Sequence, residues 1–386
     1  MASVVVTLDG SVRAPDAPLL YADDLGAVRG DGCFETVLVR DGAPLKGRAH
    51  LDRLSRSAAA LGLPAPNDGA WWAAMQRAAM LYGEEAGSAE GALRLVYTRG
   101  RESDPGTPTA YVTVSPLPDR ARRARTEGIS AITLNRGYST GLGTDAPWLL
   151  LGAKTLSYAV NMAAARYAAE QGADDVIFTS SEGRILEAPR ATVVIARGRT
   201  LVTPPAEQGI LPGTTARALF DAAEDKGVST AVEPIFPVDL VMNDGVWLVS
   251  SITLCARVHT LDGRALPDAP MDATVRSLMP GRAPRRPRTG PTPDPASRSP
   301  VVRGASRSPW SRPGRRRPGS RAAATVGSGP ATRSRRGRSV RGRGVCDTCS
   351  CPRWVRSARA ARGSACRASG CARGTPRRGS RPRDGP

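Results

Sequence analysis

Lys154 lies in the segment Leu151-Gly152-Ala153-Lys154-Thr155-Leu156-Ser157-Tyr158, where a glycine-rich stretch gives way to a helical pattern. Glu187 follows 33 residues later, at the end of the run Arg184-Ile185-Leu186-Glu187. The next notable segment is Gly209-Ile210-Leu211-Pro212-Gly213-Thr214-Thr215-Ala216-Arg217, which predicts the start of a helix. The chain thus presents, in order, an amine nucleophile, a carboxylate and a helix N-terminus suited to a phosphate.

Lys154 and Glu187 are the candidate catalytic residues. A nucleophilic amine must be neutral, so burial or a nearby cation must lower its pKa, and the Ala- and Leu-rich flanks of Lys154 favour burial. The alternative is a surface lysine at a helix start, which the helix dipole disfavours. Glu187 ends an apolar run, where an unpaired carboxylate is costly; the alternative is a glutamate on an edge strand.

Thr214 and Thr215 are candidate anion ligands. They follow Gly213 at a predicted helix start, where free N–H groups and the helix dipole favour a negative charge. The alternative is an ordinary threonine cap.

These segments resemble the class IV, or fold-type IV, pyridoxal phosphate (PLP) enzymes, over roughly residues 4–278. The family includes branched-chain aminotransferases, D-amino acid aminotransferases and 4-amino-4-deoxychorismate lyases. The resemblance implies an α+β, two-domain fold like that of D-amino acid aminotransferase, PLP as the cofactor, a small-molecule amino substrate and a homodimer.

The resemblance also assigns roles to residues. It implies that Lys154 binds PLP and that Glu187 keeps the pyridine nitrogen protonated. Arg53, in His50-Leu51-Asp52-Arg53-Leu54, matches the arginine that salt-bridges the phosphate; the alternative is a solvated arginine on a helix face. Many members carry Asn where this chain has Thr192. The remaining phosphate-binding positions are Thr214, Thr215, Ser250 and Ser251.

The motif Gly30-Asp31-Gly32-Cys33-Phe34-Glu35-Thr36 favours lyases and D-amino acid aminotransferases over branched-chain enzymes. We therefore expect a 4-amino-4-deoxychorismate lyase that forms p-aminobenzoate and pyruvate for folate biosynthesis. The alternative is a class IV aminotransferase acting on D-amino acids or branched-chain amino acids. A non-catalytic dimer or an RNA-binding protein is the contrasting hypothesis.

Hydrophobic periodicity and turn residues divide the chain into a small N-terminal α+β domain (1–118), a linker or short helix (119–128) and a larger PLP-binding domain (129–280). We predict a long loop at residues 135–148 and an irregular segment at residues 251–260. The expected helices are His50–Gly62, Asp68–Tyr82 with Asp68 as its N-cap, Leu156–Gln171 and Thr214–Lys226. The expected strands include Val4–Leu8, Phe34–Arg40, and two hairpins, Asp175–Thr179 with Arg184–Glu187 and Thr192–Ala196 with Thr200–Thr203.

Residues 281–386 account for the basic character of the chain. They contain 28 Arg and 3 Asp but no Lys or Glu, a charge of +25, whereas the whole chain carries +20; the other 280 residues therefore sum to −5. This Arg/Gly/Pro-rich tail lacks large aliphatic residues, so we expect it to be disordered and not a functional nucleic-acid arm. A frameshift is our hypothesis for its origin. Its cysteines, such as Cys346 and Cys349, lack the pattern of a zinc site, and no metal is expected.

The N-terminal residues lack a charged and apolar leader pattern, and no stretch reaches the length of a membrane span. We therefore expect a cytoplasmic enzyme without a membrane partner.

Overall fold

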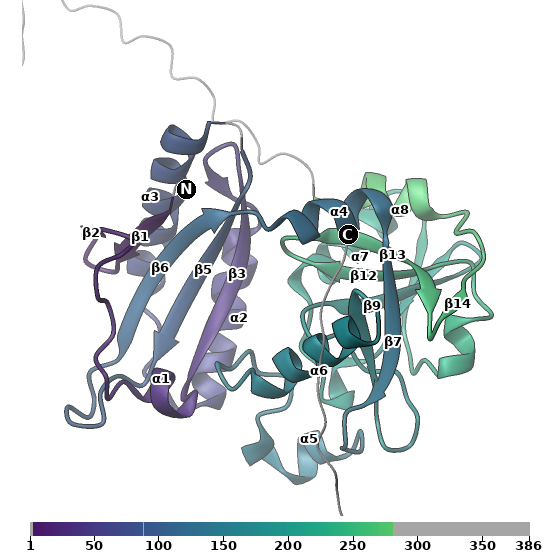
Figure 1. The fold of residues 1–386 in the computed structure, drawn as a ribbon, viewed down its shortest axis with the longest axis horizontal. Helices are drawn as coiled ribbons and strands as arrows, with labels where there is room; N and C mark the ends of the chain where they lie inside the picture. The colour runs from purple at the N-terminus through teal and green to yellow at the C-terminus, as the bar shows by residue number, and fades with distance from the viewer. Residues whose placement is uncertain (1–2, 88, 281–386) are drawn as a thin grey trace, which may run out of the picture. The chain divides into compact units, whose positions relative to one another are not determined.

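The computed structural model describes residues 3–87 and 89–280, which all belong to one compact unit of the chain (Figure 1). The predicted tail, 281–386, lies outside the described residues. No helix within the described part of the chain is long and apolar enough to cross a membrane.

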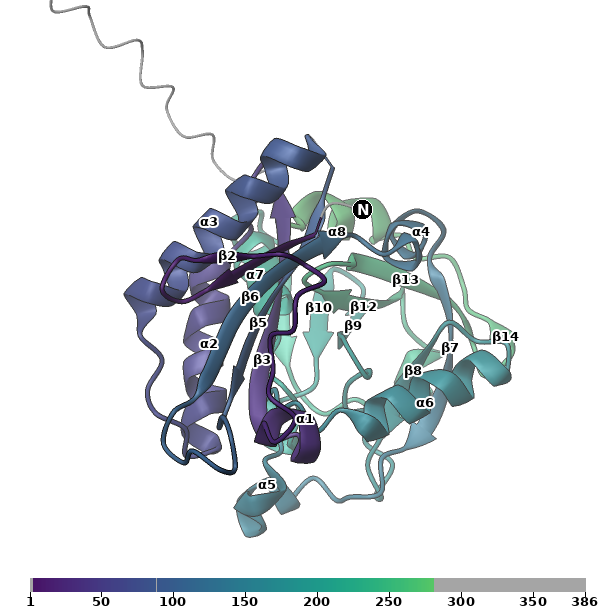
Figure 2. The same cartoon turned by 60° about the vertical axis from the view of Figure 1, so that its left-hand side comes forward.

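The first sheet is antiparallel and has the strand order β2-β1-β6-β5-β3-β4. Helices α2 (Gly47–Ala60) and α3 (Asp68–Ala86) cover one of its faces, and the second sheet lies on the other side (Figure 2). A short helix, α1 (Leu25–Arg29), precedes β3. The strands are β1 (Val4–Thr7), β2 (Val12–Arg13), β3 (Gly32–Arg40), β4 (Ala43–Pro44), β5 (Gly91–Thr98) and β6 (Thr109–Pro116).

Strand alternation gives the first sheet two different faces, because successive side chains point to opposite sides. On β3, Cys33 and Val37 belong to the core with α2 and α3, whereas Phe34 and Thr36 face a cavity. On β5 the same alternation directs Arg94 to the cavity. The first sheet therefore serves both as a core layer and as a cavity wall.

The second sheet is mixed and has the order β11-β10-β9-β12-β13-β7-β8, with β14 paired to β13. The pairs β10–β11, β13–β7 and β7–β8 are parallel. Its helices include α6 (Ala159–Glu170), α7 (Thr214–Asp225) and α8 (Asp272–Leu278). The strands are β7 (Ile129–Asn135), β8 (Asp175–Thr179), β9 (Thr192–Arg197), β10 (Thr200–Thr203), β11 (Ser229–Val232), β12 (Val246–Ser250), β13 (Leu254–Leu261) and β14 (Arg264–Ala265).

Helix α4 (Asp119–Glu127) joins the two sheets, so the segment predicted as a linker or a short helix is a nine-residue helix. Its Ala121 packs with Leu38 and Leu117 in a small core that also contacts Ile252 and Leu254. The helix is therefore held by elements far apart in the sequence. The predicted domain boundary on either side of it stays a prediction.

The predicted α+β fold is confirmed, and its hairpins show why. Asp41 and Gly42 have φ of 52° and 69°, the left-handed conformation that a tight hairpin between β3 and β4 requires. The predicted hairpin of β9 and β10 also forms.

Several predicted boundaries are wrong because tertiary hydrogen bonds decide them. Leu156 N donates to Gly32 O, which holds the segment before Ala159 out of the helix, so α6 begins three residues later than predicted. Residues 184–187 form no regular strand, although Leu186 N donates to Phe178 O of β8. Asn67, not Asp68, caps α3, because its side chain accepts from Ala70 N.

Two segments predicted as irregular contain regular structure. The segment 251–260 includes most of β13, which pairs with both β12 and β7. The loop 135–148 contains helix α5 (Leu142–Asp145) and runs into the 3-10 helix η1 (Pro147–Leu149).

Candidate active site

A cavity of about 1030 Å³ lies between the two sheets, and both contribute to its walls. The first sheet supplies side chains of β3 and β5, and the second supplies the segments before α6 and α7 and the end of β12. The residues singled out from the sequence all line this cavity: Arg53, Lys154, Glu187, Thr214, Thr215, Ser250 and Ser251.

Lys154 is fixed by its main chain and surrounded by aromatic rings. Its N–H donates to Ser57 Oγ over 3.1 Å, and its carbonyl accepts from Phe34 N over 3.1 Å. Its Nζ lies 4.6 Å from the centroid of the Phe34 ring and 5.6 Å from that of Tyr158. Burial lowers the pKa of Lys154 to about 8, so a fraction of the amine is neutral near pH 7. Lys154 precedes α6 by five residues, so the helix dipole does not decide its state.

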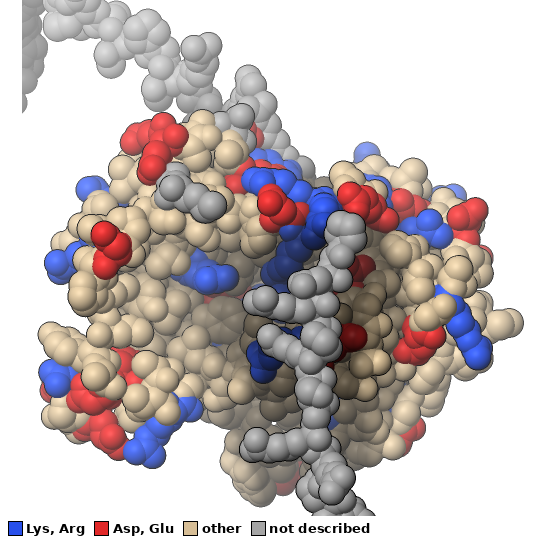
Figure 3. Space-filling model, in the orientation of Figure 1, with Lys and Arg blue, Asp and Glu red and all other residues tan. Residues whose placement is uncertain are grey.

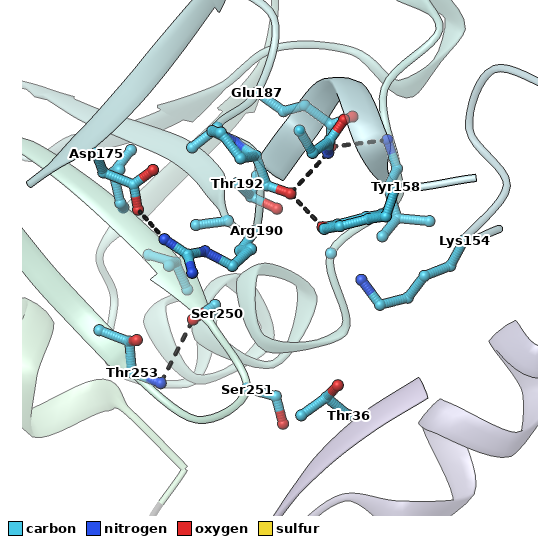
Figure 4. Close-up of a pocket in the computed structure, with 18 of the residues that line it drawn as sticks. Thr36, Lys154, Tyr158, Asp175, Glu187, Arg190, Thr192, Ser250, Ser251 and Thr253 are labelled. Carbon is cyan, nitrogen blue, oxygen red and sulfur yellow. Dashed lines mark hydrogen bonds and ion pairs between the residues drawn. The ribbon is translucent and has the colours of Figure 1, made fainter. Parts of the chain in front are cut away.

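Glu187 reaches the cavity from a segment bound to β8. Its carbonyl accepts from Phe178 N over 2.9 Å, and its Oε2 accepts from Leu211 N over 3.1 Å. Burial raises the pKa of Glu187 to about 7, because one backbone donor does not replace full hydration. Figure 4 shows Glu187, Tyr158 and Lys154 around the same part of the cavity. The carboxyl group can therefore exchange a proton with a partner near neutral pH.

Arg53 is buried, not solvated, with 6% of its surface exposed. Its Nε and Nη2 donate to the two carboxylate oxygens of Glu35 over 2.7 and 2.8 Å, and its Nη1 donates to Pro212 O over 2.9 Å. Guanidinium has five N–H groups, so two remain for a ligand in the cavity. Glu35 thus neutralises Arg53 and fixes the plane of the guanidinium.

His50 connects Glu35 to the start of α7. Its Nδ1 lies 2.8 Å from Glu35 Oε2, and its Nε2 lies 3.2 Å from Thr214 Oγ1 and 3.3 Å from Ser251 Oγ. Ser251 Oγ also accepts from Leu38 N over 3.3 Å. Burial lowers the pKa of His50, which favours the neutral ring as a link between the carboxylate and the two hydroxyl groups.

The sequence prediction did not include Glu35 and His50 among the site residues. Two signals pointed to them. Glu35 lies between Cys33 and Val37 on the face of β3 that packs in the core, where a carboxylate is unexpected. His50 and Arg53 are three residues apart, on one side of α2.

The first turn of α7 is open to the cavity. Its N-cap is Gly213, which has no side chain to cap the free N–H groups, so Thr214 is the first helical residue and the ordinary threonine cap is excluded. A Cβ at Gly213 would lie 2.3 Å from Thr192 Oγ1. Thr192 therefore requires glycine at this position, and the bare helix start is suited to an anion.

The Amino-transferase class IV profile matches residues 32–261, more than half of the chain. The chain belongs to the class IV aminotransferase family. The resemblance seen in the sequence is therefore confirmed.

Relatives of known name and structure agree with this family. A Mycobacterium tuberculosis protein named bifunctional aminodeoxychorismate lyase / D-amino acid transaminase is 53% identical over 283 residues, which cover 72% of this chain and 97% of that protein. The PLP-bound form of a hypothetical aminotransferase from M. tuberculosis is 53% identical with a TM-score of 0.70, covering 72% of this chain and 97% of that one. A fold IV transaminase from Curtobacterium pusillum is 38% identical with a TM-score of 0.69, covering 73% and 100%.

Class IV aminotransferases depend on PLP, and the chain is a PLP-dependent enzyme. The cavity residues fit this cofactor. Lys154 offers an amine that is partly neutral, Glu187 a half-buried carboxyl group with a raised pKa, and the first turn of α7 a set of uncapped N–H groups. These groups match the aldehyde, the ring nitrogen and the phosphate of PLP.

Proposed function

We propose that this chain is a 4-amino-4-deoxychorismate lyase, which forms p-aminobenzoate and pyruvate for folate biosynthesis. One observation supports proton-transfer chemistry most strongly: Lys154 and Glu187 line one cavity, with the pKa of the amine lowered to about 8 and that of the carboxyl group raised to about 7. The name of the 53% identical relative includes the lyase reaction.

Lys154 and Glu187 have different roles in this proposal. When bound, PLP withdraws electrons from the carbon next to the amino group of the substrate. Lys154 Nζ holds the cofactor before substrate arrives and then, as a neutral amine, removes the proton from that carbon. Glu187 holds a proton on the pyridine nitrogen. Phe34 and Tyr158 keep water away from Nζ.

The phosphate-binding residues orient the cofactor. The two spare N–H groups of Arg53 and the uncapped N–H groups of α7 donate to the phosphate. His50 aligns two of the hydroxyl groups through its Nε2. The hydroxyl groups that complete the phosphate site belong to Thr214, Thr215, Ser250 and Ser251.

D-amino acid transamination is the second candidate, because the name of the same relative includes it. Lys154, Glu187, Arg53 and the first turn of α7 would have the same roles in both reactions. The substrate that binds therefore determines which reaction follows. We would assay the purified chain with 4-amino-4-deoxychorismate, measuring p-aminobenzoate, and with D-alanine plus 2-oxoglutarate, measuring pyruvate; L-leucine tests the branched-chain alternative. A higher kcat/KM for lyase turnover supports the proposal. Turnover of D-alanine without any p-aminobenzoate refutes it.

We also propose that the enzyme is a homodimer. Large apolar side chains are exposed on α6 and on η1 before it: Trp148, Leu149, Val160, Met162 and Tyr167. Such a patch is characteristic of a protein interface. Sedimentation of the chain and of Val160→Asp should show a dimer and a dissociated variant, and a monomer for the unaltered chain would contradict the proposal.

The enzyme is proposed to act in the cytoplasm, because its two described cysteines, Cys33 and Cys255, are free and buried. Fractionation of the host cells tests this location.

A further inference from the structure

Helix α4 directs arginines into the cavity from one side. Arg120, Arg123, Ala124 and Glu127 line the cavity, and they recur at the three- and four-residue intervals that define one face of a helix. Arg122, on the same helix, does not line the cavity and pairs instead with Asp119 at 3.2 Å. Arg122 and Arg125 of α4 thus form ion pairs, with Asp119 and Glu90, whereas Arg120 and Arg123 lie at the cavity.

Arg190 approaches the same region from the segment after Glu187. Its Nη2 lies 3.9 Å from Asp175 Oδ2, too far for a hydrogen bond. Its Nε is buried and has no hydrogen-bond partner. Figure 4 shows Arg190 extending toward Asp175, on the side of the cavity away from Lys154. A buried N–H without an acceptor is costly, so this side chain lacks a partner that an anionic ligand would supply.

Arg94, on β5, is a further guanidinium group in this part of the cavity. Within the described residues neither Arg94 nor Arg120 has an ion pair, although both line the cavity. The pKa of Arg120 is lowered by desolvation and by the charges of Arg190 and Arg94, and the carboxylate of Asp175 acts on it in the opposite direction. Figure 3 shows both Lys or Arg and Asp or Glu side chains at the hollow in the middle of the molecule. The three guanidinium groups outnumber the one carboxylate, Asp175, that acts on Arg120, and this excess of positive charge favours an anion between them.

We propose that Arg120 and Arg190, together with Arg94, bind a second carboxylate of the substrate, so that the cavity selects amino substrates with two carboxylate groups. Guanidinium groups present pairs of N–H donors that match a carboxylate, which a single ammonium group does not. The amine of Lys154 and the carboxyl group of Glu187 occupy another part of the same cavity, so the reacting carbon and the distal carboxylate have separate places.

This inference rests on the proposed function and deepens it. 4-Amino-4-deoxychorismate carries two carboxylates, as does D-glutamate, whereas D-alanine carries one. The arginine group therefore explains how one cavity could serve a lyase and a transaminase, provided that both substrates are diacids.

Binding of unreactive acids tests the site without any turnover. Isothermal calorimetry on the PLP-loaded enzyme would compare glutarate with butyrate, which has one carboxylate fewer. In Arg190→Gln and Arg120→Gln, glutarate should bind ~10- to 100-fold more weakly, the loss expected for one charged hydrogen-bond donor, and butyrate should change much less. The matched control Arg122→Gln, on the outer side of α4, should bind glutarate as the unaltered chain does. The basic segment 281–386 is the same in all variants and contributes equally.

Arg120→Gln alters an exposed side chain, so it keeps the test valid if Arg190→Gln fails to fold. Equal losses for glutarate and butyrate, or an equal loss in Arg122→Gln, would overturn the proposal. A fall in PLP affinity as large as the fall in glutarate affinity would also overturn it, because the arginines would then serve the cofactor.

Kinetics separate this proposal from the proposed function. The ratio of KM for D-glutamate to KM for D-alanine should rise at least tenfold in both variants. If the enzyme prefers glutarate in binding but turns over no amino substrate, the proposed function fails and the diacid site stands. If it turns over substrates but the ratio of KM values is unchanged, the diacid site fails.

Discussion

Replacing Glu35 by Gln should destabilise the protein more than any exposed charge change. Glu35 is fully buried and receives charge-assisted hydrogen bonds from Arg53 Nε, Arg53 Nη2 and His50 Nδ1. Glu35→Gln removes the charge that neutralises buried Arg53, and breaking such a pair costs roughly 3–5 kcal/mol. For a body of this size the melting temperature should fall by roughly 10 °C.

Thermal and urea unfolding measure this loss, with Glu102→Gln as the control. Glu102 pairs with Arg29 at 2.7 Å, but 58% and 64% of the two side chains are exposed, so that variant should lose less than about 1 kcal/mol. Arg53 and His50 hold the pKa of Glu35 well below its usual range. The pair therefore stabilises the fold at any pH above the ordinary carboxyl pKa, and it weakens only as pH falls toward the folded value. The difference in the free energy of unfolding between Glu35→Gln and the unaltered chain should be constant from about pH 5 to 8. A loss no larger than that of Glu102→Gln would refute the reasoning.

Three further predictions concern the cofactor site. Glu187→Gln should retain PLP but slow turnover by ~10²-fold or more, with the exposed Glu182→Gln as control; near-normal turnover would mean that another group protonates the ring. Gly213→Ala should weaken PLP binding, because the added Cβ would lie 2.3 Å from Thr192 Oγ1, and a second change, Thr192→Ala, should partly restore the binding. The control Gly69→Ala should have no effect, because its Cβ would have no neighbour closer than 3.5 Å. Capture of PLP by the cofactor-free enzyme should speed up about tenfold per pH unit up to about pH 8 and then level off, because the neutral fraction of Lys154 increases in that window; a rate that continues to increase to pH 10 would indicate an ordinary lysine.

The sequence singled out residues that line the cavity, and their roles stay predictions, but it did not single out Glu35 and His50, which hold Arg53 and Thr214 in place. Lys154, Glu187 and Thr214 stand out because their types and order match one chemistry, and strand alternation on β3 predicts which side chains face the core. Local patterns do not show that Arg53 donates to Glu35, because that contact joins α2 to β3.

Long-range packing explains the remaining errors. Residues 119–128 were predicted as a linker or a short helix, and the packing of Ala121 with Leu38 and Leu117 holds the helix so that Arg120 and Arg123 line the cavity. The segment around Leu156 has a helical pattern, but its hydrogen bond to Gly32 O holds it in an extended path. The partners, Leu38 and Gly32, are far away in the sequence, so local sequence patterns cannot predict these contacts.

Covalent trapping of the cofactor tests the central claim most directly. The chain has three lysines, Lys46, Lys154 and Lys226, and Lys154 alone among them lines the cavity. Borohydride reduction of the PLP-loaded enzyme, followed by peptide mapping, should place one pyridoxyl group on Lys154, and Lys154→Ala should remove it. A pyridoxyl group on Lys46 or Lys226, with Lys154 unlabelled, would contradict the account.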